Sequence, residues 1–511
     1  MNLTEDKDNL NAIAPGVVEA YAKLKSTDGM GIYTSAGRFY NHTLFGRDAS
    51  MSAKFVADFD HQVAVDTIMA LAALQGTKTD SVTQEEPGRV HHELRDFTTW
   101  HGAWPERLML RFFKSQWGAQ NDQLLTYFSV DSTASFVRLI NKYAYHIDKS
   151  ILSRKVTNHH DEVVTVEQSL AEAADWLTRQ IDTLGHFAPK RTNRRSLPFQ
   201  IYEDSPTSYI RQDGSLLNYK RPIAYASAQI FACDALEDAS KLLPKHPRRH
   251  VWQDAAHQLR DSFIRDFWQE KQAYFASAID SYGQSNLDSV SIGWTLNNGL
   301  WDELDKGLRA EKIGAIVRRL FSNGFLTKVG LRTRAIDLPQ PLNGTLEYHD
   351  ADAVWPMFTF MVIEGLRRHK LYRLAEQLEN RLLNGINAMG NFPEFIDVDK
   401  DGRILRPVNR GEKHDFSVKA QMRPEECIAF TVVPSLTLAR RIANGNQPKP
   451  LTKGWQKELE DEILSGIDSV DLAEPTKAED AIGTVVPIKL NRLAGNLRTV
   501  WFFLKESRNL K

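Results

Sequence analysis

Acidic side chains that could act as catalytic acids and bases occur in short clusters that are far apart in the sequence. The carboxyl groups concerned belong to Glu93, Asp131, Glu203, Asp204, Asp350, Glu394, Glu425 and Glu426. Cleavage of a glycosidic bond needs one protonated carboxyl group at the leaving oxygen and one ionised carboxylate behind the anomeric carbon. The carboxyl groups in these clusters could therefore carry out acid–base chemistry on a sugar.

The same clusters contain side chains of the types that bind sugars. Phe45-Gly46-Arg47-Asp48 places an arginine beside an aspartate, and His349 is followed closely by Trp355. Aromatic rings stack on the apolar face of a sugar, and charged groups hydrogen-bond its hydroxyls, often in pairs. Further residues of these types near the clusters are Arg95, Trp104 and Arg332.

Each cluster, taken alone, also has a purely structural explanation. Asp48 and Asp131 could cap the N-termini of helices, and Trp355-Pro356 could place a proline in a first helical turn. Pro393-Glu394 could begin a helix whose dipole favours the carboxylate, and Glu203-Asp204-Ser205-Pro206 is common turn chemistry. What weighs against these explanations is that the clusters share one position relative to the predicted helices.

Helical periodicity dominates the chain. Residues 371, 374, 378, 382 and 386 are leucine or isoleucine, spaced three or four apart, as on the buried face of a helix. Similar stripes predict helices over 48–59, 61–77, 132–148, 166–182, 225–243, 250–268, 289–302, 311–322, 353–369, 372–389, 424–444 and 453–467. A further helix is predicted over about 15–25.

The connections between these helices predict their arrangement. They are mostly short within successive pairs, at about 2 to 17 residues, and longer between pairs, at about 20 to 55 residues. Short connections favour antiparallel neighbours, and long ones are typical of binding loops. We therefore expect an all-α fold, a six-hairpin (α/α)6 barrel with its long loops at one end. Every cluster precedes an odd-numbered helix, so all the clusters should meet at that mouth.

Composition restricts the domain organisation, the location and the partners. The 511 residues carry 64 basic and 65 acidic side chains, so no overall positive field attracts nucleic acid or an anionic membrane. No apolar run is long enough to span a bilayer, and the acidic, polar N-terminus does not resemble a secretory signal. Two cysteines cannot form a disulfide framework. We expect one catalytic domain over 1–511 in the cytoplasm, with an N-terminal extension helix in 1–25 and a C-terminal extension at 470–511.

Seven motifs in order resemble one family of enzymes. FGRDAS, EEPGRVHHELRD, YFSVDSTASF, YEDSPTS with DGSLLNYKRPIAYASAQ, GLRTRA, YHDADAVWP and FPEFIDVDKDG lie between about residues 30 and 445. They resemble amylo-alpha-1,6-glucosidase and other glycogen-debranching-type glycoside hydrolases, which are related to glucoamylase and glucosylglycerate hydrolase. The resemblance implies a six-hairpin barrel, no cofactor, and inverting hydrolysis of an α-linked sugar.

The resemblance also implies roles for individual residues. Asp204 is similar to the family's general acid and Glu394 to its general base, with Glu203 as an alternative acid. The alternatives for the base are Glu93, Asp131, Asp350, Glu425 and Glu426. The resemblance and the cluster positions together give the expected substrate-binding residues, which are Phe45, Arg47, Asp48, Glu93, Asp131, Tyr202, Glu203, Arg332, His349 and Trp355. We also expect Glu203 to raise the pKa of Asp204 by repulsion between like charges.

Several positions depart from the family pattern. Tyr202-Glu203 replaces Trp-Lys before the acid, and Pro424-Glu425-Glu426-Cys427 replaces Pro-Gln-Ala-Trp. Tyr-His-Asp-Ala-Asp-Ala-Val-Trp-Pro at 348–356 also differs from the usual Tyr-His-Arg-Gly-Thr-Val-Trp-Pro. These differences affect the identity of the substrate more than the chemistry.

The expected function is therefore an inverting glycoside hydrolase acting on a terminal α-glucosidic bond of a small or oligosaccharide substrate. The alternatives are a sugar phosphorylase, epimerase or lyase on the same barrel, and an inactive carbohydrate-binding scaffold. No metal is expected. His91-His92-Glu93 lacks the second histidine of a helical zinc motif, and Asp397, Asp399 and Asp401 resemble a calcium loop that lacks its final glutamate. The sequence leaves open the sugar, the linkage, the aglycone, the oligomeric state, and whether Asp397, Asp399 and Asp401 bind calcium.

Overall fold

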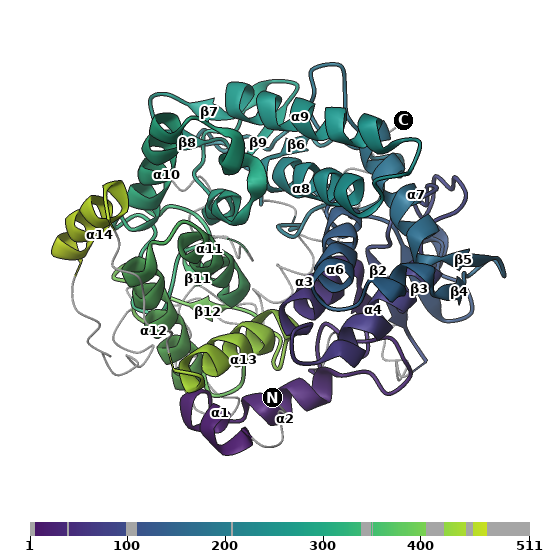
Figure 1. Ribbon diagram of the computed structural model, residues 1–511, viewed down its shortest axis with the longest axis horizontal. Helices are drawn as coiled ribbons and strands as arrows, with labels where there is room; N and C mark the ends of the chain where they lie inside the picture. Colours follow the sequence, from purple (N-terminus) through teal and green to yellow (C-terminus); the bar gives the residue numbers. More distant parts are fainter. Residues whose placement is uncertain are drawn as a thin grey trace.

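The computed structural model describes residues 6–37, 40–98, 110–205, 208–338, 349, 351–404, 424–445 and 453–467 (Figure 1). The helices in these ranges are α1 (Lys7–Ile13), α2 (Val17–Leu24), α3 (Gly46–Val56), α4 (His61–Ala73), η1 (Phe113–Trp117), α6 (Ser132–His146), η2 (Lys149–Ser153), α7 (Val166–Arg179), α8 (Ala226–Leu242), α9 (Arg249–Asp266), η3 (Val290–Asn297), η4 (Gly299–Glu303), α10 (Lys306–Leu320), α11 (Pro356–Arg368), α12 (Tyr372–Met389), α13 (Ala429–Ala443) and α14 (Trp455–Gly466).

Six of these helices form a closed inner ring. In ring order they are α3, α6, α8, η3, α11 and α13, and each packs on the next until α13 returns to α3. An outer helix packs against each of the first five: α4 on α3, α7 on α6, α9 on α8, α10 on η3 and α12 on α11 (Figure 1). Because each outer helix follows its inner partner in the chain, the architecture is the predicted all-α (α/α)6 barrel.

The sixth outer position differs from the prediction. We expected 453–467 to pair with the helix over 424–444, but α14 packs against α10 and α12 on the outside of the ring. The N-terminal helices α1 and α2 pack on α13 instead, at the bottom of Figure 1. Tyr21 of α2 donates a 3.1 Å hydrogen bond to Asp60, and Asp60 caps α4 by accepting from the Val63 amide. The prediction paired the helices by their order in the sequence. In the structure, α2 buries its apolar face against α13 and closes the ring there.

The predicted helix over 289–302 is also irregular. It consists of two short 3₁₀ helices, η3 and η4, separated by Asn298 in an extended conformation. Its sequence contains a glycine and several β-branched residues, which are weak α-helix formers. A Cβ atom on Gly293 would lie 2.6 Å from Val362 of α11 and 2.9 Å from Leu320 of α10. Close packing between neighbouring helices therefore decides the conformation of this segment.

Short strands hold the segments that lead into the inner helices. They are β1 (Leu44–Phe45), β2 (Glu93–Asp96), β3 (Gln123–Thr126), β4 (Lys155–Thr157), β5 (Val163–Thr165), β6 (Ala224–Tyr225), β7 (Trp268–Gln269), β8 (Tyr274–Phe275), β9 (Ala278–Asp280), β10 (Gly283–Gln284), β11 (Ala353–Val354) and β12 (Ile396–Asp397). β1 precedes α3, β6 precedes α8 and β11 precedes α11. The antiparallel order β1-β2-β3 pairs Phe45 with Glu93, and β11 pairs with β12.

One large apolar core joins the helices of both rings, and a second, smaller cluster contains Phe97, Phe113 and Trp117. Trp176, Trp252, Trp294 and Trp301 are among the largest fully buried side chains of the large core. Among the described residues, no helix is both long and apolar enough to cross a bilayer. The core reaches every helix of both rings, so the inner helices are held firmly enough to position polar side chains at their ends.

The close contact at Gly293 gives a test of the ring. Gly293→Ala should lower the free energy of unfolding by roughly 1–3 kcal/mol, because the new methyl group would overlap with Val362 and Leu320. Urea denaturation followed by far-UV circular dichroism measures the change. Gly466→Ala is the matched control, since no atom lies within 4 Å of its Cβ position. Equal midpoints for the two variants would contradict the packing described for η3.

Candidate active site

Polar and aromatic residues gather where the inner helices begin. Arg47 and Asp48 lie in the first turn of α3, Asp131 immediately precedes α6, and Trp355 immediately precedes α11. Phe45 lies in β1, directly before α3. Since consecutive inner helices start at the same end of the barrel, residues from distant parts of the sequence share one mouth.

Arg47, Asp48 and Asp131 form a buried charged group. The Arg47 Nε donates to Asp48 Oδ1 at 2.8 Å, and its Nη1 lies 3.9 Å from Asp131 Oδ2. Within the described part of the chain, neither Nη1 of Arg47 nor Oδ2 of Asp131 makes a hydrogen bond, although both atoms are buried. Burying unsatisfied polar atoms costs free energy, so this pair is suited to receive hydroxyl groups of a ligand.

The helix-cap explanation is wrong for both aspartates. Asp131 occupies the N-cap position of α6 without making a side-chain cap. The Ser129 hydroxyl does that work, because it accepts from the Ser132 amide at 3.1 Å and donates to Asp131 Oδ1 at 2.6 Å. Asp48 lies inside α3 and is bound to Arg47. Burial raises the pKa of Asp48, and the neighbouring Arg47 opposes that rise.

Asp204 lies within the field of this group. Burial raises the pKa of Asp204 to about 7, Arg47 lowers it, and Asp48 and Glu93 raise it. The carboxyl group can therefore carry a proton near neutral pH, unlike an ordinary aspartate. We expected Glu203 to cause such a rise, but the charges that act on Asp204 come from other loops.

Tyr40 links the two sides of the mouth, and sequence reasoning missed it. Burial raises its pKa, as do the charges of Glu394, Asp204 and Glu93, whereas Arg95 lowers it. The Arg95 guanidinium lies 5.2 Å from the centroid of the Tyr40 ring and forms a 2.9 Å ion pair with Glu93. Tyr40 lies five residues before Phe45, and the aromatic character of that segment was the signal available.

Glu394 lies in the segment before β12 and is paired with Glu425 through the backbone. The Glu394 amide donates to the Glu425 carbonyl at 2.8 Å, and the Glu425 amide lies 3.4 Å from Glu394 Oε2. The Glu425 side chain accepts from the Ser35 hydroxyl at 2.8 Å. Glu425 therefore holds the segment at Ser35, while Glu394 is 6% exposed and acts on Tyr40.

An aromatic wall borders the site. The His349 ring stacks on Trp355 with centroids 4.6 Å apart, and Trp355 stacks in turn on Phe358 and Phe395. Burial lowers the pKa of His349 well below its usual value, with Arg334 and Arg47 acting in the same direction. His349 is therefore a neutral ring at physiological pH. Pro356 occupies the first turn of α11, as the local reading of Trp355-Pro356 predicted.

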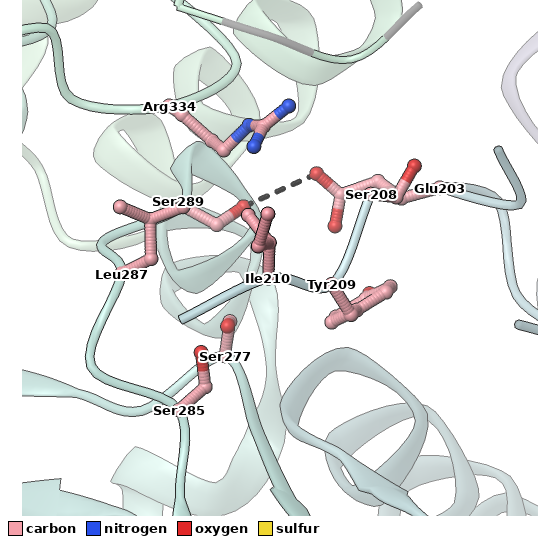
Figure 2. A pocket seen from close by; sticks show the side chains of 9 residues that line it. All are labelled: Glu203, Ser208, Tyr209, Ile210, Ser277, Ser285, Leu287, Ser289 and Arg334. Carbon is pink, nitrogen blue, oxygen red and sulfur yellow. Dashed lines mark hydrogen bonds between the residues drawn. The ribbon is translucent and has the colours of Figure 1, made fainter. Parts of the chain in front are cut away.

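Glu203 and Tyr202 have partners outside the group formed by Arg47, Asp48 and Asp131. Figure 2 shows Glu203 at a small pocket, where its Oε1 accepts from the Ser289 hydroxyl at 3.3 Å. Burial raises the pKa of Glu203 to about 7, while Tyr209 and Arg334 lower it. Tyr202 is buried, with its ring stacked on Trp294 at 4.3 Å. The expected repulsion from Glu203 is not among the causes of the raised pKa of Asp204, to which the carboxylates of Asp48 and Glu93 contribute instead.

Arg332 is held by backbone carbonyl groups. Its guanidinium donates to the carbonyls of Ala351, Asp399 and Lys400 at 2.6–3.1 Å. Asp399 Oδ1 accepts from the Arg403 amide, so 396–404 is a tight hairpin beside Glu394. Arg332 thereby fixes the position of this hairpin.

Three features that the sequence predicts cannot be located among the described residues. Trp104 and Asp350 lie outside the described residues, as does the extension at 470–511. Arg334, present in the quoted Gly-Leu-Arg-Thr-Arg motif but not selected, contacts the site by donating to the His349 carbonyl at 2.7 Å.

No protein-family model matches the chain, and no curated protein matches it in sequence. Solved structures do match. The GH63 mannosylglycerate hydrolase from Thermus thermophilus in complex with glucose has 13% identity and a TM-score of 0.54, over 83% of this chain and 99% of that one. The same enzyme in complex with Tris and D-glycerate gives the same values. An uncharacterised conserved protein from the same organism has a TM-score of 0.52 at 13% identity, with the same coverage. The likeness supports the six-hairpin (α/α)6 barrel fold of this chain.

The raised pKa of Asp204 predicts a pH-dependent change in stability. A carboxyl group whose folded-state pKa is raised stabilises the protein below its unfolded pKa, and this contribution is lost as pH rises through the folded value near 7. Asp204→Asn should therefore melt roughly 1–3 °C above the wild type at pH 8 and close to it at pH 4. Scanning calorimetry across this range measures the difference. Asp213→Asn, on the exposed part of the same loop, is the control; a pH-independent difference for Asp204→Asn would contradict the assignment.

Proposed function

We propose that the protein is an inverting glycoside hydrolase that cleaves a terminal α-glucosidic bond, with Asp204 as general acid and Glu394 as general base. The observation that carries this proposal is that Asp204 can hold a proton near neutral pH while its charge and that of Glu394 act on the same tyrosine, Tyr40. A glycosidase needs two carboxyl groups that flank one position and differ in protonation. The barrel mouth supplies both from different loops.

Asp204 protonates the glycosidic oxygen as its bond to the anomeric carbon breaks. Glu394 takes a proton from a water molecule, whose oxygen attacks the opposite face of that carbon. The leaving alcohol thus carries the proton from Asp204, and the sugar is released with inverted configuration. Since the pKa of Asp204 is near 7, the protonated fraction falls above neutral pH and the rate should fall with it.

The charged group at the start of α3 and α6 is the proposed grip on the terminal sugar. Arg47 Nη1 and Asp131 Oδ2 are buried without hydrogen bonds among the described residues and lie 3.9 Å apart, so a sugar hydroxyl could bridge them. Asp48 fixes the Arg47 guanidinium by their 2.8 Å contact. Charge-assisted hydrogen bonds of this kind are among the strongest that a hydroxyl can receive.

The remaining site residues divide into walls and supports. Phe45, Tyr40 and the stacked pair His349–Trp355 provide flat surfaces at the mouth. The charge of Glu93 raises the pKa of both Asp204 and Tyr40. Tyr202, Glu203 and Arg332 are bound within the protein and act by positioning the segments that carry Asp204, His349 and Glu394.

We propose the substrate class from the small charged group of Arg47, Asp48 and Asp131 and from the structural likeness. A solved relative is a mannosylglycerate hydrolase with structures containing glucose and D-glycerate, which favours a small α-glycoside as substrate. An α-1,6-linked oligosaccharide, suggested by the sequence motifs, is the second candidate. We also propose that the chain forms a single catalytic domain.

The stereochemical course tests the reaction class. Proton NMR of a reaction with an α-glucoside should show the β-anomer of glucose first, followed by mutarotation. The panel should include glucosylglycerate, mannosylglycerate and isomaltose, each with and without phosphate. Retention of the anomeric configuration would indicate a double-displacement mechanism and contradict the proposed inversion. A sugar phosphate formed only with phosphate present would indicate a phosphorylase, and no turnover of any substrate would favour a binding scaffold.

The division of labour between the two carboxyl groups gives a separate test. Asp204→Asn should lower kcat/KM by roughly 10²–10⁴-fold for alkyl glycosides and far less for aryl glycosides with acidic leaving groups. Glu394→Gln should lower both similarly, because water must be activated whichever group departs. Steady-state kinetics on matched alkyl and nitrophenyl α-glucosides measures both effects. Asp213→Asn should behave as the wild type, and the opposite pattern for the two variants would exchange their roles.

A further inference from the structure

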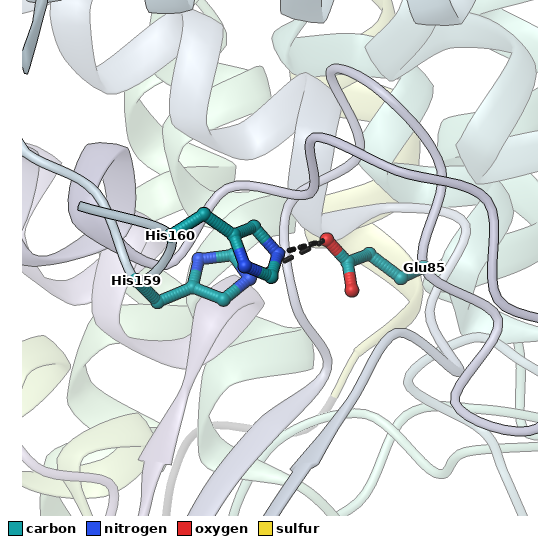
Figure 3. A group of neighbouring side chains, drawn as sticks. All are labelled: Glu85, His159 and His160. Atoms are coloured by element: carbon teal, nitrogen blue, oxygen red, sulfur yellow. Dashed lines mark hydrogen bonds and ion pairs between the residues drawn. The ribbon is translucent and has the colours of Figure 1, made fainter. Parts of the chain in front are cut away.

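Two histidines and a glutamate converge outside the candidate active site. Figure 3 shows the rings of His159 and His160 directed towards the Glu85 carboxylate. Glu85 lies in the connection between α4 and β2, and both histidines lie in the hairpin between β4 and β5. This hairpin projects from the outside of the ring, at the right of Figure 1. One potential ligand atom from each side chain lies within 4.8 Å of the others.

The β4–β5 turn holds two successive histidines on the same side. The side chain of Asn158 accepts from the amides of His160 and Glu162, and the Asn158 amide donates to the Glu162 carbonyl. Asp161 adopts a positive φ of 63°, which completes this tight turn. In a regular strand, successive side chains would point to opposite faces. The turn removes that restriction and brings both imidazoles to Glu85.

Neighbouring backbone groups hold the His159 ring and the Glu85 carboxylate in position. The His159 Nδ1 lies 3.2 Å from the carbonyl oxygen of Ala73, at the end of α4. A carbonyl can only accept, so Nδ1 carries a proton, and in the neutral ring Nε2 then presents its lone pair towards Glu85. This pattern, with one ring nitrogen bound to a carbonyl and the other facing the ion, is typical of metal-binding histidines. Glu85 Oε1 is held by the Thr77 amide at 3.0 Å.

The distances match a metal site better than an ion pair. Glu85 Oε1 lies 3.4 Å from His159 Nε2 and 3.3 Å from His160 Nε2. Charge-assisted hydrogen bonds are usually about 2.7–2.9 Å long, so both contacts are too long to be strong ones. Two ligands of a tetrahedral ion with bonds of about 2.0–2.1 Å are separated by about 3.3 Å. The carboxylate is thus at the spacing from both nitrogens that a shared tetrahedral ion would impose.

The partial exposure of the two histidines leaves room for a further ligand. The Glu85 side chain is 6% exposed, whereas His159 and His160 are 19% and 29% exposed. The imidazoles therefore form the outer side of the cluster and allow an ion and a water molecule to enter. Two imidazole nitrogens with one carboxylate oxygen suit zinc and similar transition metals, whereas magnesium and calcium prefer oxygen ligands alone.

We propose that Glu85, His159 and His160 bind one zinc ion, or a related divalent transition metal, with water as the fourth ligand. The site joins the β4–β5 hairpin to the segment that follows α4. Gln84, adjacent to Glu85, accepts hydrogen bonds from Ser196 and from Gln200, four residues before Asp204. The metal therefore has a structural role, which fixes the segment supporting the loop that carries the proposed acid.

Metal binding can be measured without any substrate. Protein treated with a chelator and then dialysed should bind one equivalent of zinc with micromolar or tighter affinity, as shown by isothermal titration calorimetry and elemental analysis. Zinc at 100 times its dissociation constant should raise the melting temperature by roughly 1–4 °C. Nitrogen-15 NMR of labelled histidine should show coordination through Nε2 at two rings. Binding of less than one equivalent, or coordination by other histidines, would overturn the proposal and leave the cluster as an ion pair.

Two variants locate the site, and one controls for histidine loss. His160→Ala should weaken zinc binding roughly 100-fold or more, and Glu85→Gln should weaken it while still accepting from the Thr77 amide. His257→Ala removes an exposed histidine of α9 and should bind zinc as the wild type does. Unchanged affinity in either site variant would exclude the assigned ligands. If circular dichroism shows that one site variant folds poorly, the zinc affinity of the other variant and the wild-type NMR spectrum test the assigned ligands instead.

Discussion

Closure of the inner ring is the constraint on which the rest of the molecule depends. α3, α6, α8, η3, α11 and α13 pack in a circle, and the apolar face of each is buried only if the circle is complete. The chain returns to the same end before each inner helix, so the first turns of these helices surround one opening. That placement explains why Arg47 and Asp204 influence each other, and why the charges of Asp204 and Glu394 both act on Tyr40. It also explains why the N-terminal helix α2 matters, because it covers α13 where the circle closes.

Burial of charged groups at this opening shifts their pKa values. Removing carboxyl groups from water favours their neutral form, whereas nearby arginines favour the ionised form. At Asp204 burial and the carboxylates of Asp48 and Glu93 outweigh Arg47, and the pKa rises to about 7. The same arginine is paired with Asp48, so in the proposed function it binds the sugar while Asp204 keeps its proton. A site with both signs of charge, arranged at helix starts, is well suited to an uncharged substrate rich in hydroxyl groups.

Much of the polar structure around the site serves to hold its loops. Arg332 binds three carbonyls, Glu425 binds Ser35, and Ser129 replaces Asp131 as a helix cap. Each of these contacts satisfies backbone or hydroxyl groups that would otherwise be buried without partners. The consequence is a division between residues that face the mouth and residues that fix the loops. The cluster of Glu85, His159 and His160 extends this division to the outside of the ring.

The sequence by itself determined the fold class and the positions of most helices, because the spacing of apolar residues at three and four reports a buried helical face directly. It also identified Arg47, Asp48, Asp131 and Asp204 as members of one group, since their clusters shared a position before successive inner helices. Only the tertiary structure decided that α2 rather than α14 covers α13, that η3 is a 3₁₀ helix, and that Glu203 accepts a hydrogen bond from Ser289. The sequence likewise did not reveal the place of Tyr40 or the convergence of His159 with Glu85. These features depend on contacts between residues far apart in the chain, which local periodicity does not record.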